Sequence, residues 1–106
     1  MVKILFDQGV PVPLGQELTG LEITTAYRMG WNNLSNGALL KAAEGAGITV
    51  LVTTDQNLRY QQNLKERRIA ILVLSTTRWP EIKAHAGKIR DAISRIQPGD
   101  YRELVW

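Results

Sequence analysis

The sequence predicts an α/β fold in which a mainly parallel sheet of about four or five strands carries helices on both faces. Three short, continuous apolar runs rich in β-branched residues cover 2–6, 47–53 and 68–74, as expected of strands buried on both faces. Helical stretches separate these runs, and such alternation is typical of parallel strands joined by right-handed crossovers. The 106 residues of the chain suit a single domain, 1–106.

The elements between these strands are assigned from periodicity and from helix signals. A weaker strand fits 21–26, and helices fit 12–18, 36–45 and 57–67. The sequence therefore predicts helices in every connection between the buried strands, which is the requirement for parallel pairing.

The last third of the chain predicts a long helix followed by an edge strand. Pro80 begins the helix, which ends at the Gln-Pro-Gly of 97–99. Its apolar side chains recur at spacings of three and four, forming one stripe: Ile82, Ala86, Ile89, Ile93 and Ile96. The stripe favours a core helix lying on the sheet; a seam in a homodimer or against a partner is the alternative. The tail 101–106 can add an edge strand, antiparallel to its neighbour.

Composition and charge narrow the class of protein. The chain is 44% hydrophobic and 22% charged, with no cysteine, so disulfides, thiolate metal sites and thiol nucleophiles are excluded. No apolar stretch approaches the ~18 residues of a membrane span, and we expect a cytoplasmic protein with no membrane partner. Between Arg59 and Arg95, nine basic residues stand against three acidic ones. This basic half suits a polyanionic partner such as RNA, and a solvated basic surface is the alternative.

Two aspartates lie where the predicted strands end. Asp7 follows the first strand and Asp55 follows the run 47–53. Functional groups of open α/β sheets collect beyond the carboxyl ends of the strands, so both carboxylates are candidates for one crevice. Two close carboxylates repel unless a proton or a cation lies between them, and a divalent metal ion resolves the repulsion. Taken singly, Asp55 can be an N-cap and Asp7 can stabilise a turn.

Two other polar residues have ordinary structural explanations. Asn36 opens the helix 36–45, where its amide can cap the first N–H groups. His85 lies beside the apolar stripe of the last helix without a partner nearby in the sequence, which indicates a packed boundary histidine.

Three segments resemble the minimal PIN-like domains of bacteria and archaea, relatives of the ribonuclease toxins of toxin–antitoxin loci. These are "MVKILFDQGVP", "LSNGALLKAAEGAGITVLVTTDQNLRYQQNL" and "RRIAILVL", in order through about residues 2–74. The resemblance implies a single PIN-like domain, with a parallel sheet and a carboxylate cluster that holds Mg²⁺ or Mn²⁺ for phosphodiester hydrolysis.

The acidic pattern of that family is only partly present. The family has acidic pairs where this chain has Asp7 and Gln8, Asn36 and Ala38, and Asp55 and Asn57. Only Asp7 and Asp55 keep the carboxylate, while Gln8, Asn36 and Asn57 are amides. Mg²⁺ can be held by one or two carboxylates when waters and substrate phosphates complete its octahedron. The resemblance thus implies a reduced acidic site with weak affinity for the metal.

Two functions of different classes follow. The first is a metal-dependent endoribonuclease, with Asp7 and Asp55 as metal ligands and with Asn36 and Asn57 orienting the attacking water. Its phosphate-contacting residues are Arg59, Arg67 and Arg68. As a toxin, it implies a small antitoxin-like protein as partner. The second is a non-catalytic PIN-like module that binds nucleic acid or a small partner protein through the basic half or the last helix.

Overall fold

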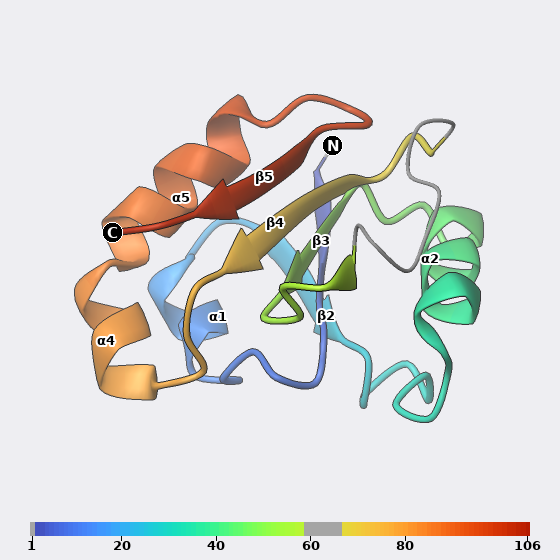
Figure 1. Cartoon of the computed structure of the whole chain (residues 1–106), viewed down its shortest axis with the longest axis horizontal. Helices are drawn as coiled ribbons and strands as arrows, with labels where there is room; N and C mark the ends of the chain where they lie inside the picture. The colour runs from blue at the N-terminus through green and yellow to red at the C-terminus, as the bar shows by residue number, and fades with distance from the viewer. Residues whose placement is uncertain (1, 59–66) are drawn as a thin grey trace.

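The chain forms one five-stranded, all-parallel sheet with helices on both faces (Figure 1). This is a computed structural model, and it describes residues 2–58 and 67–106. The strands lie in the order β2-β1-β3-β4-β5. The described elements are β1 Lys3–Phe6, α1 Leu14–Glu17, β2 Glu22–Thr25, α2 Asn36–Gly45, β3 Val50–Thr53, β4 Ala70–Leu74, α4 Trp79–Ala84, α5 Ala86–Arg95 and β5 Tyr101–Leu104. The predicted α/β fold is confirmed.

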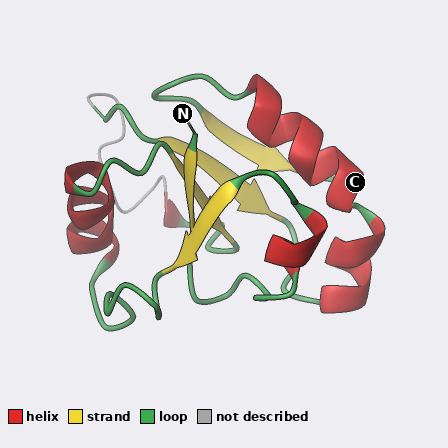
Figure 2. Ribbon diagram, turned by 180° about the vertical axis from the view of Figure 1, so that it is seen from behind, coloured by secondary structure: helices red, strands yellow, loops and turns green. Residues whose placement is uncertain are grey.

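The two faces of the sheet bury separate cores because side chains alternate along each strand. Ile4 and Phe6 of β1 point into a first core, which α1, α4 and α5 cover. Leu5 of β1 and Leu51 of β3 point into a second core, against Leu39, Leu40 and Ala43 of α2. Figures 1 and 2 show α2 on one side of the sheet, with α1, α4 and α5 on the opposite side. A fully buried leucine or isoleucine contributes roughly 1.5–3 kcal/mol, so both cores stabilise the sheet.

β5 pairs with β4 in parallel, so the expected antiparallel direction is wrong. The chain leaves the carboxyl end of β4, runs back along α4 and α5, and starts β5 at the amino end of β4. There the backbone N–H of Ile71 donates to the carbonyl of Asp100 at 2.8 Å. Parallel strands need a crossover connection of a dozen or more residues, and α4 with α5 provides it.

The predicted long last helix is two helices that meet at His85, whose backbone is not helical (φ −111°, ψ 18°). The His85 ring stacks on Trp106 with centroids 4.5 Å apart, and the Trp106 indole donates to the Glu81 carboxylate at 3.1 Å. His85 is half-buried in this contact, which confirms a packed boundary histidine. The isoleucine stripe survives the break, since Ile82, Ile89 and Ile93 are buried in the first core. The interpretation as core helices is therefore confirmed.

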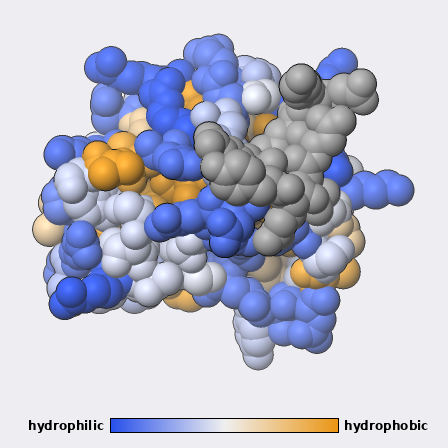
Figure 3. Space-filling model, viewed as in Figure 1, coloured by the Kyte–Doolittle hydropathy of each residue, from blue (hydrophilic) through white to orange (hydrophobic). Residues whose placement is uncertain are grey.

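The other predicted helices vary in extent. The helix over 36–45 is confirmed as α2, whereas the one over 12–18 shortens to α1. The predicted helix over 57–67 lies mostly outside the described residues. Among those that are described, no helix is long and apolar enough to cross a membrane. The face in Figure 3 is mainly hydrophilic with small hydrophobic patches.

Candidate functional site

The strand order reverses at β1, and this switch point lies at the carboxyl edge of the sheet. From β1 the chain crosses to β2 on one side, and the next crossover carries it to β3 on the other side. Ligands of open α/β sheets bind beyond the carboxyl ends of the strands at such a switch point. Asp7 follows β1 directly, and Asp55 lies two residues beyond β3. The structure therefore brings both predicted carboxylates to the switch point.

Thr53 connects the two aspartates. Its hydroxyl donates to Asp7 Oδ2 at 2.8 Å and accepts the backbone N–H of Asp55 at 3.1 Å. Thr53 is fully buried, and it is the only buried polar residue in the described part of the chain. A buried hydroxyl needs partners to offset its desolvation, and here both partners belong to the candidate site. Thr53 thus fixes the position of Asp7 relative to the loop that carries Asp55.

Both aspartates share one pattern of hydrogen bonds. Oδ1 of each accepts a local backbone N–H: from Gln8 at 2.8 Å for Asp7, and from Asn57 at 2.9 Å for Asp55. Oδ2 of each accepts from a distant side chain, which is Thr53 for Asp7 and Asn36 for Asp55. The local bonds match the turn roles that each aspartate can have alone. The distant bonds join β1, β3 and α2 into one site.

Asn36 does not cap its helix, contrary to expectation. Ser35 is the N-cap of α2, and its hydroxyl accepts the backbone N–H of Ala38 at 3.3 Å. The Asn36 amide therefore faces the site, where Nδ2 donates to Asp55 Oδ2 at 3.0 Å. The sequence does not indicate which of the two residues is the N-cap, because Ser and Asn are both favoured caps and only one can occupy the position.

The other predicted site residues are less involved. Asn57 contacts Asp55 through its backbone, and its side chain is exposed. Gln8 is exposed and likewise contacts Asp7 through its backbone. Asn36 is therefore the one amide of the three that contacts a site carboxylate with its own side chain.

Gly9 brings the loop after β1 against the loop after β3. A Cβ at Gly9 would lie 2.1 Å from Thr54 Oγ1, closer than non-bonded atoms approach. The two loops that carry the aspartates thus touch beyond the strand ends. Thr53 and Gly9 are site residues that sequence reasoning missed, although the polar Thr-Thr-Asp at the end of an apolar strand was a usable signal.

The donor set is compatible with a small hard cation. Each aspartate oxygen accepts one hydrogen bond in the described part of the chain, whereas a carboxylate offers about four acceptor positions in all. Both carboxylates are half-buried, and no basic side chain of the described residues pairs with them. No group of three or more His, Cys, Asp or Glu within the described ranges could hold a metal. Two carboxylates and neutral oxygens fit Mg²⁺ or Mn²⁺ with a substrate phosphate, and not a closed zinc site.

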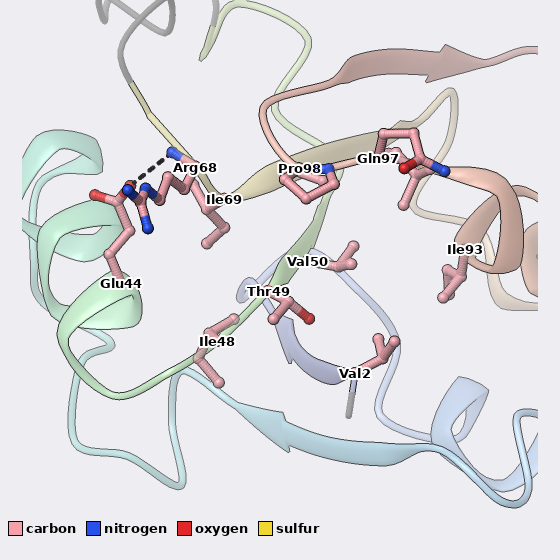
Figure 4. Close-up of a pocket in the computed structure, with 12 residues that line it drawn as sticks. Val2, Glu44, Ile48, Thr49, Val50, Arg68, Ile69, Ile93, Gln97 and Pro98 are labelled. Carbon is pink, nitrogen blue, oxygen red and sulfur yellow. Dashed lines mark hydrogen bonds between the residues drawn. The ribbon is translucent and has the colours of Figure 1, made fainter.

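The predicted RNA-contacting arginines lie elsewhere. Arg67 and Arg68 precede β4, so they are at the amino edge of the sheet, opposite the aspartates. Arg67 forms an ion pair with Glu44, and the Arg68 backbone N–H donates to Glu44 at 3.2 Å. Figure 4 shows Glu44 and Arg68 at one end of a mainly apolar pocket of about 430 Å³ there, with Gln97 and Pro98 at the other. Arg59 is outside the described residues.

A second pocket, of about 610 Å³, lies at the carboxyl edge beside Asp7. Its lining includes Val12 from the loop after β1 and Tyr27 and Arg28 from the turn after β2. Neither Tyr27 nor Arg28 was singled out from the sequence, because each is isolated there from any motif.

Comparison of the chain with protein-family models, with curated proteins and with solved structures gave no match. The fold and the geometry at the carboxyl edge of the sheet therefore carry the functional argument.

Proposed function

We propose that this protein is a Mg²⁺- or Mn²⁺-dependent endoribonuclease of the PIN-like type with a reduced acidic site. The observation that carries the proposal is the pair Asp7 and Asp55 at the switch point of the sheet, joined through Thr53 and without a basic partner among the described residues. A partly buried carboxylate is stabilised by a cation or by hydrogen bonds that its charged form accepts. Asp7 and Asp55 accept only neutral donors within the described residues, so both keep their negative charge available for a cation.

Each residue of the site has a defined part in this proposal. Asp7 and Asp55 would hold the cation, while Thr53 and Asn36 hold the two carboxylates in place. When bound, the cation would supply Lewis-acid stabilisation of the charge that develops on the phosphoryl oxygens. The reaction adds water across a phosphodiester: the water oxygen bonds to phosphorus, one P–O ester bond breaks, and the leaving oxygen takes a proton. The products are a phosphate monoester and an alcohol.

The charge distribution supports RNA as the substrate. Nine of the thirteen basic residues of the chain lie between Arg59 and Arg95, with three acidic ones. Arg90 and Arg95 are engaged within the fold, the former with the carbonyl of Thr19 and the latter with Asp91. Arg68, Arg78, Lys83 and Lys88 are exposed and can neutralise phosphates. A toxin role would add a small antitoxin-like protein as partner, encoded next to this chain.

The proposal is tested with the metal and with RNA in parallel. Thermal unfolding with Mn²⁺ should show a melting temperature that rises as the ion concentration passes its Kd, since only the folded state holds both carboxylates together. Cleavage of single-stranded RNA should require the ion and should fall more than about 100-fold in Asp7→Asn and in Asp55→Asn. The matched control is Asp100→Asn, because Asp100 is half-buried and accepts a local backbone N–H at the opposite edge.

A parent protein that shows neither a Mn²⁺ response nor cleavage contradicts the nuclease. So does cleavage that survives in Asp7→Asn, because contaminating nuclease then explains it. Equal loss in Asp100→Asn would attribute the effect to folding.

The absence of a third acidic side chain from the site, within the described residues, favours a second candidate function. This is a PIN-like module that binds nucleic acid or a small partner protein without cleaving it. It predicts that the logarithm of the RNA association constant falls linearly with the logarithm of the salt concentration. The slope should be about −0.7 for each phosphate neutralised. The same protein would show no Mn²⁺ response.

A further inference from the structure

The turn after β2 holds two side chains at the edge of the pocket beside Asp7. Its ends are anchored by Ala26, which is buried, and by Trp31, which packs against the second core. The Trp31 N–H donates to the Ala26 carbonyl at 2.8 Å, and the Arg28 N–H donates to Thr25 Oγ1 at 3.0 Å. Gly30, at φ +75°, completes the turn in a conformation that glycine adopts readily. The hydrogen bonds of the turn therefore hold the backbone from which Tyr27 and Arg28 project before any ligand arrives.

Tyr27 and Arg28, whose side chains carry polar groups, are both exposed. Tyr27 is 78% exposed, and Val12, which also lines the pocket, is 69% exposed. In the part of the chain that the structure describes, neither the Tyr27 hydroxyl nor the Arg28 guanidinium has a hydrogen bond or an ion pair. Arg28 is also the only basic residue among those described that line the pocket, which Asp7 borders as well. Single exposed apolar residues are common, but an aromatic ring, a valine and an arginine around one hollow form a binding surface.

We infer that this pocket binds one nucleotide of a single strand, with its base stacked on Tyr27 and its phosphate on Arg28. The inference rests on the proposed function, since it names the subsite that delivers the strand to Asp7. A pocket of about 610 Å³ is within the range of small-molecule sites and too small to bury the face of a protein partner. Aromatic rings stack on unpaired bases of any sequence, and arginine binds phosphate. A duplex keeps its bases stacked on one another, so it does not supply this ligand.

The test measures binding without cleavage. Fluorescence anisotropy of a labelled single-stranded RNA oligonucleotide in chelator gives Kd for the parent and the variants. Tyr27→Ala should weaken binding at least about fivefold, and Tyr27→Phe should remain within about twofold of the parent because the ring is kept. Arg28→Gln should reduce the salt slope by about 0.7, and Arg28→Lys should retain it. Arg102→Gln is the matched control, since Arg102 is an exposed arginine on β5, the farther edge strand.

The outcomes separate this inference from the nuclease proposal. Binding that depends on Tyr27, together with no cleavage under any metal, keeps the subsite and removes the nuclease. If cleavage depends on the metal while Kd is unchanged in both Tyr27→Ala and Arg28→Gln, the nuclease proposal stands and the proposed subsite is wrong. A parent protein that fails to bind the oligonucleotide at low salt overturns the subsite too. Equal dependence on Tyr27 for a duplex of the same sequence overturns the stacking.

Discussion

The carboxylates at the two edges of the sheet have different partners. At the amino edge, Glu44 accepts the Arg67 guanidinium and the Arg68 backbone N–H, with side-chain exposures of 28% for Glu44 and 25% for Arg67. At the carboxyl edge, Asp7 and Asp55 accept only neutral donors within the described residues. The Thr53 hydroxyl there donates to the Asp7 carboxylate and accepts the Asp55 backbone N–H, and no positive side chain of the described residues pairs with either carboxylate. Within the described residues, a cationic side chain therefore pairs with Glu44, and none pairs with Asp7 or Asp55.

This difference explains why burial alone does not identify a functional acid. Glu44, Asp7 and Asp55 are all half-buried, yet their partners differ in charge. In a partly buried ion pair, each charged group is neutralised by the other. Carboxylates that neutral groups orient remain open to an external cation. The comparison therefore predicts opposite responses to mutation at the two edges.

The largest effect is expected when a third carboxylate is added to the open edge. Asn36→Asp removes the donor to Asp55 Oδ2 and places a like charge there, so the apo protein should lose about 1–3 kcal/mol. With Mn²⁺, the same charge should tighten binding about tenfold or more. Melting temperatures in chelator and in Mn²⁺ give both values. Asn57→Asp is the matched control, and its smaller effect follows from its exposed side chain.

A metal-induced gain in Asn36→Asp that is no larger than in the parent would show that Asn36 does not border a cation site. The assignment would then rest on Asp7 and Asp55 alone.

The second prediction compares the two edges directly. Glu44→Gln leaves Arg67 without its carboxylate and should cost about 1–2 kcal/mol of unfolding free energy. Asp7→Asn should cost less, under about 1 kcal/mol in chelator, since the amide oxygen still accepts one of the two hydrogen bonds that Asp7 receives while the negative charge near Asp55 is removed. Urea unfolding of both variants measures the difference. If Asp7→Asn is the more costly of the two, Asp7 is a structural residue.

The third prediction concerns the contact between the two loops of the open edge. Gly9→Ala should cost about 1 kcal/mol, because its Cβ requires Thr54 to move. Gly87→Ala in α5 is the control, with no atom within 4 Å of its added Cβ, and it should stabilise the protein by about 0.5–1 kcal/mol. Thr54→Ala should rescue Gly9→Ala if the clash is the cause. A double variant no more stable than Gly9→Ala would place the cost in the backbone of the loop.

Much of the fold follows from sequence because it depends on local patterns. The apolar runs of β1, β3 and β4 and the helix over 36–45 are visible in period and composition. The direction of β5 and the break at His85 are not, since they depend on contacts between distant residues. At the break, the His85 ring stacks on Trp106, which lies 21 residues further along the chain.

The candidate site, like the fold, was predictable only as far as it depends on local sequence patterns. Strand ends place Asp7 and Asp55 at one edge, and parallel topology brings them together. The hydroxyl bridge of Thr53 needs the register between β1 and β3, which periodicity does not give. Similarly, Asn36 reaches Asp55 only because Ser35 takes the cap. Tyr27 and Arg28 line the pocket beside Asp7 from a turn whose position depends on the whole sheet.

The aspartates follow two of the three interior strands of the sheet. β1 lies between β2 and β3, and β3 lies between β1 and β4. Amide hydrogens in such strands exchange with solvent through openings close to global unfolding, whereas edge strands such as β2 and β5 open at lower free energy. The ladder extends to Asp7 itself, whose backbone N–H donates to the Val52 carbonyl at 2.9 Å. The backbone that carries Asp7 therefore keeps its position as long as the protein is folded, and a ligand that binds there does not have to order it.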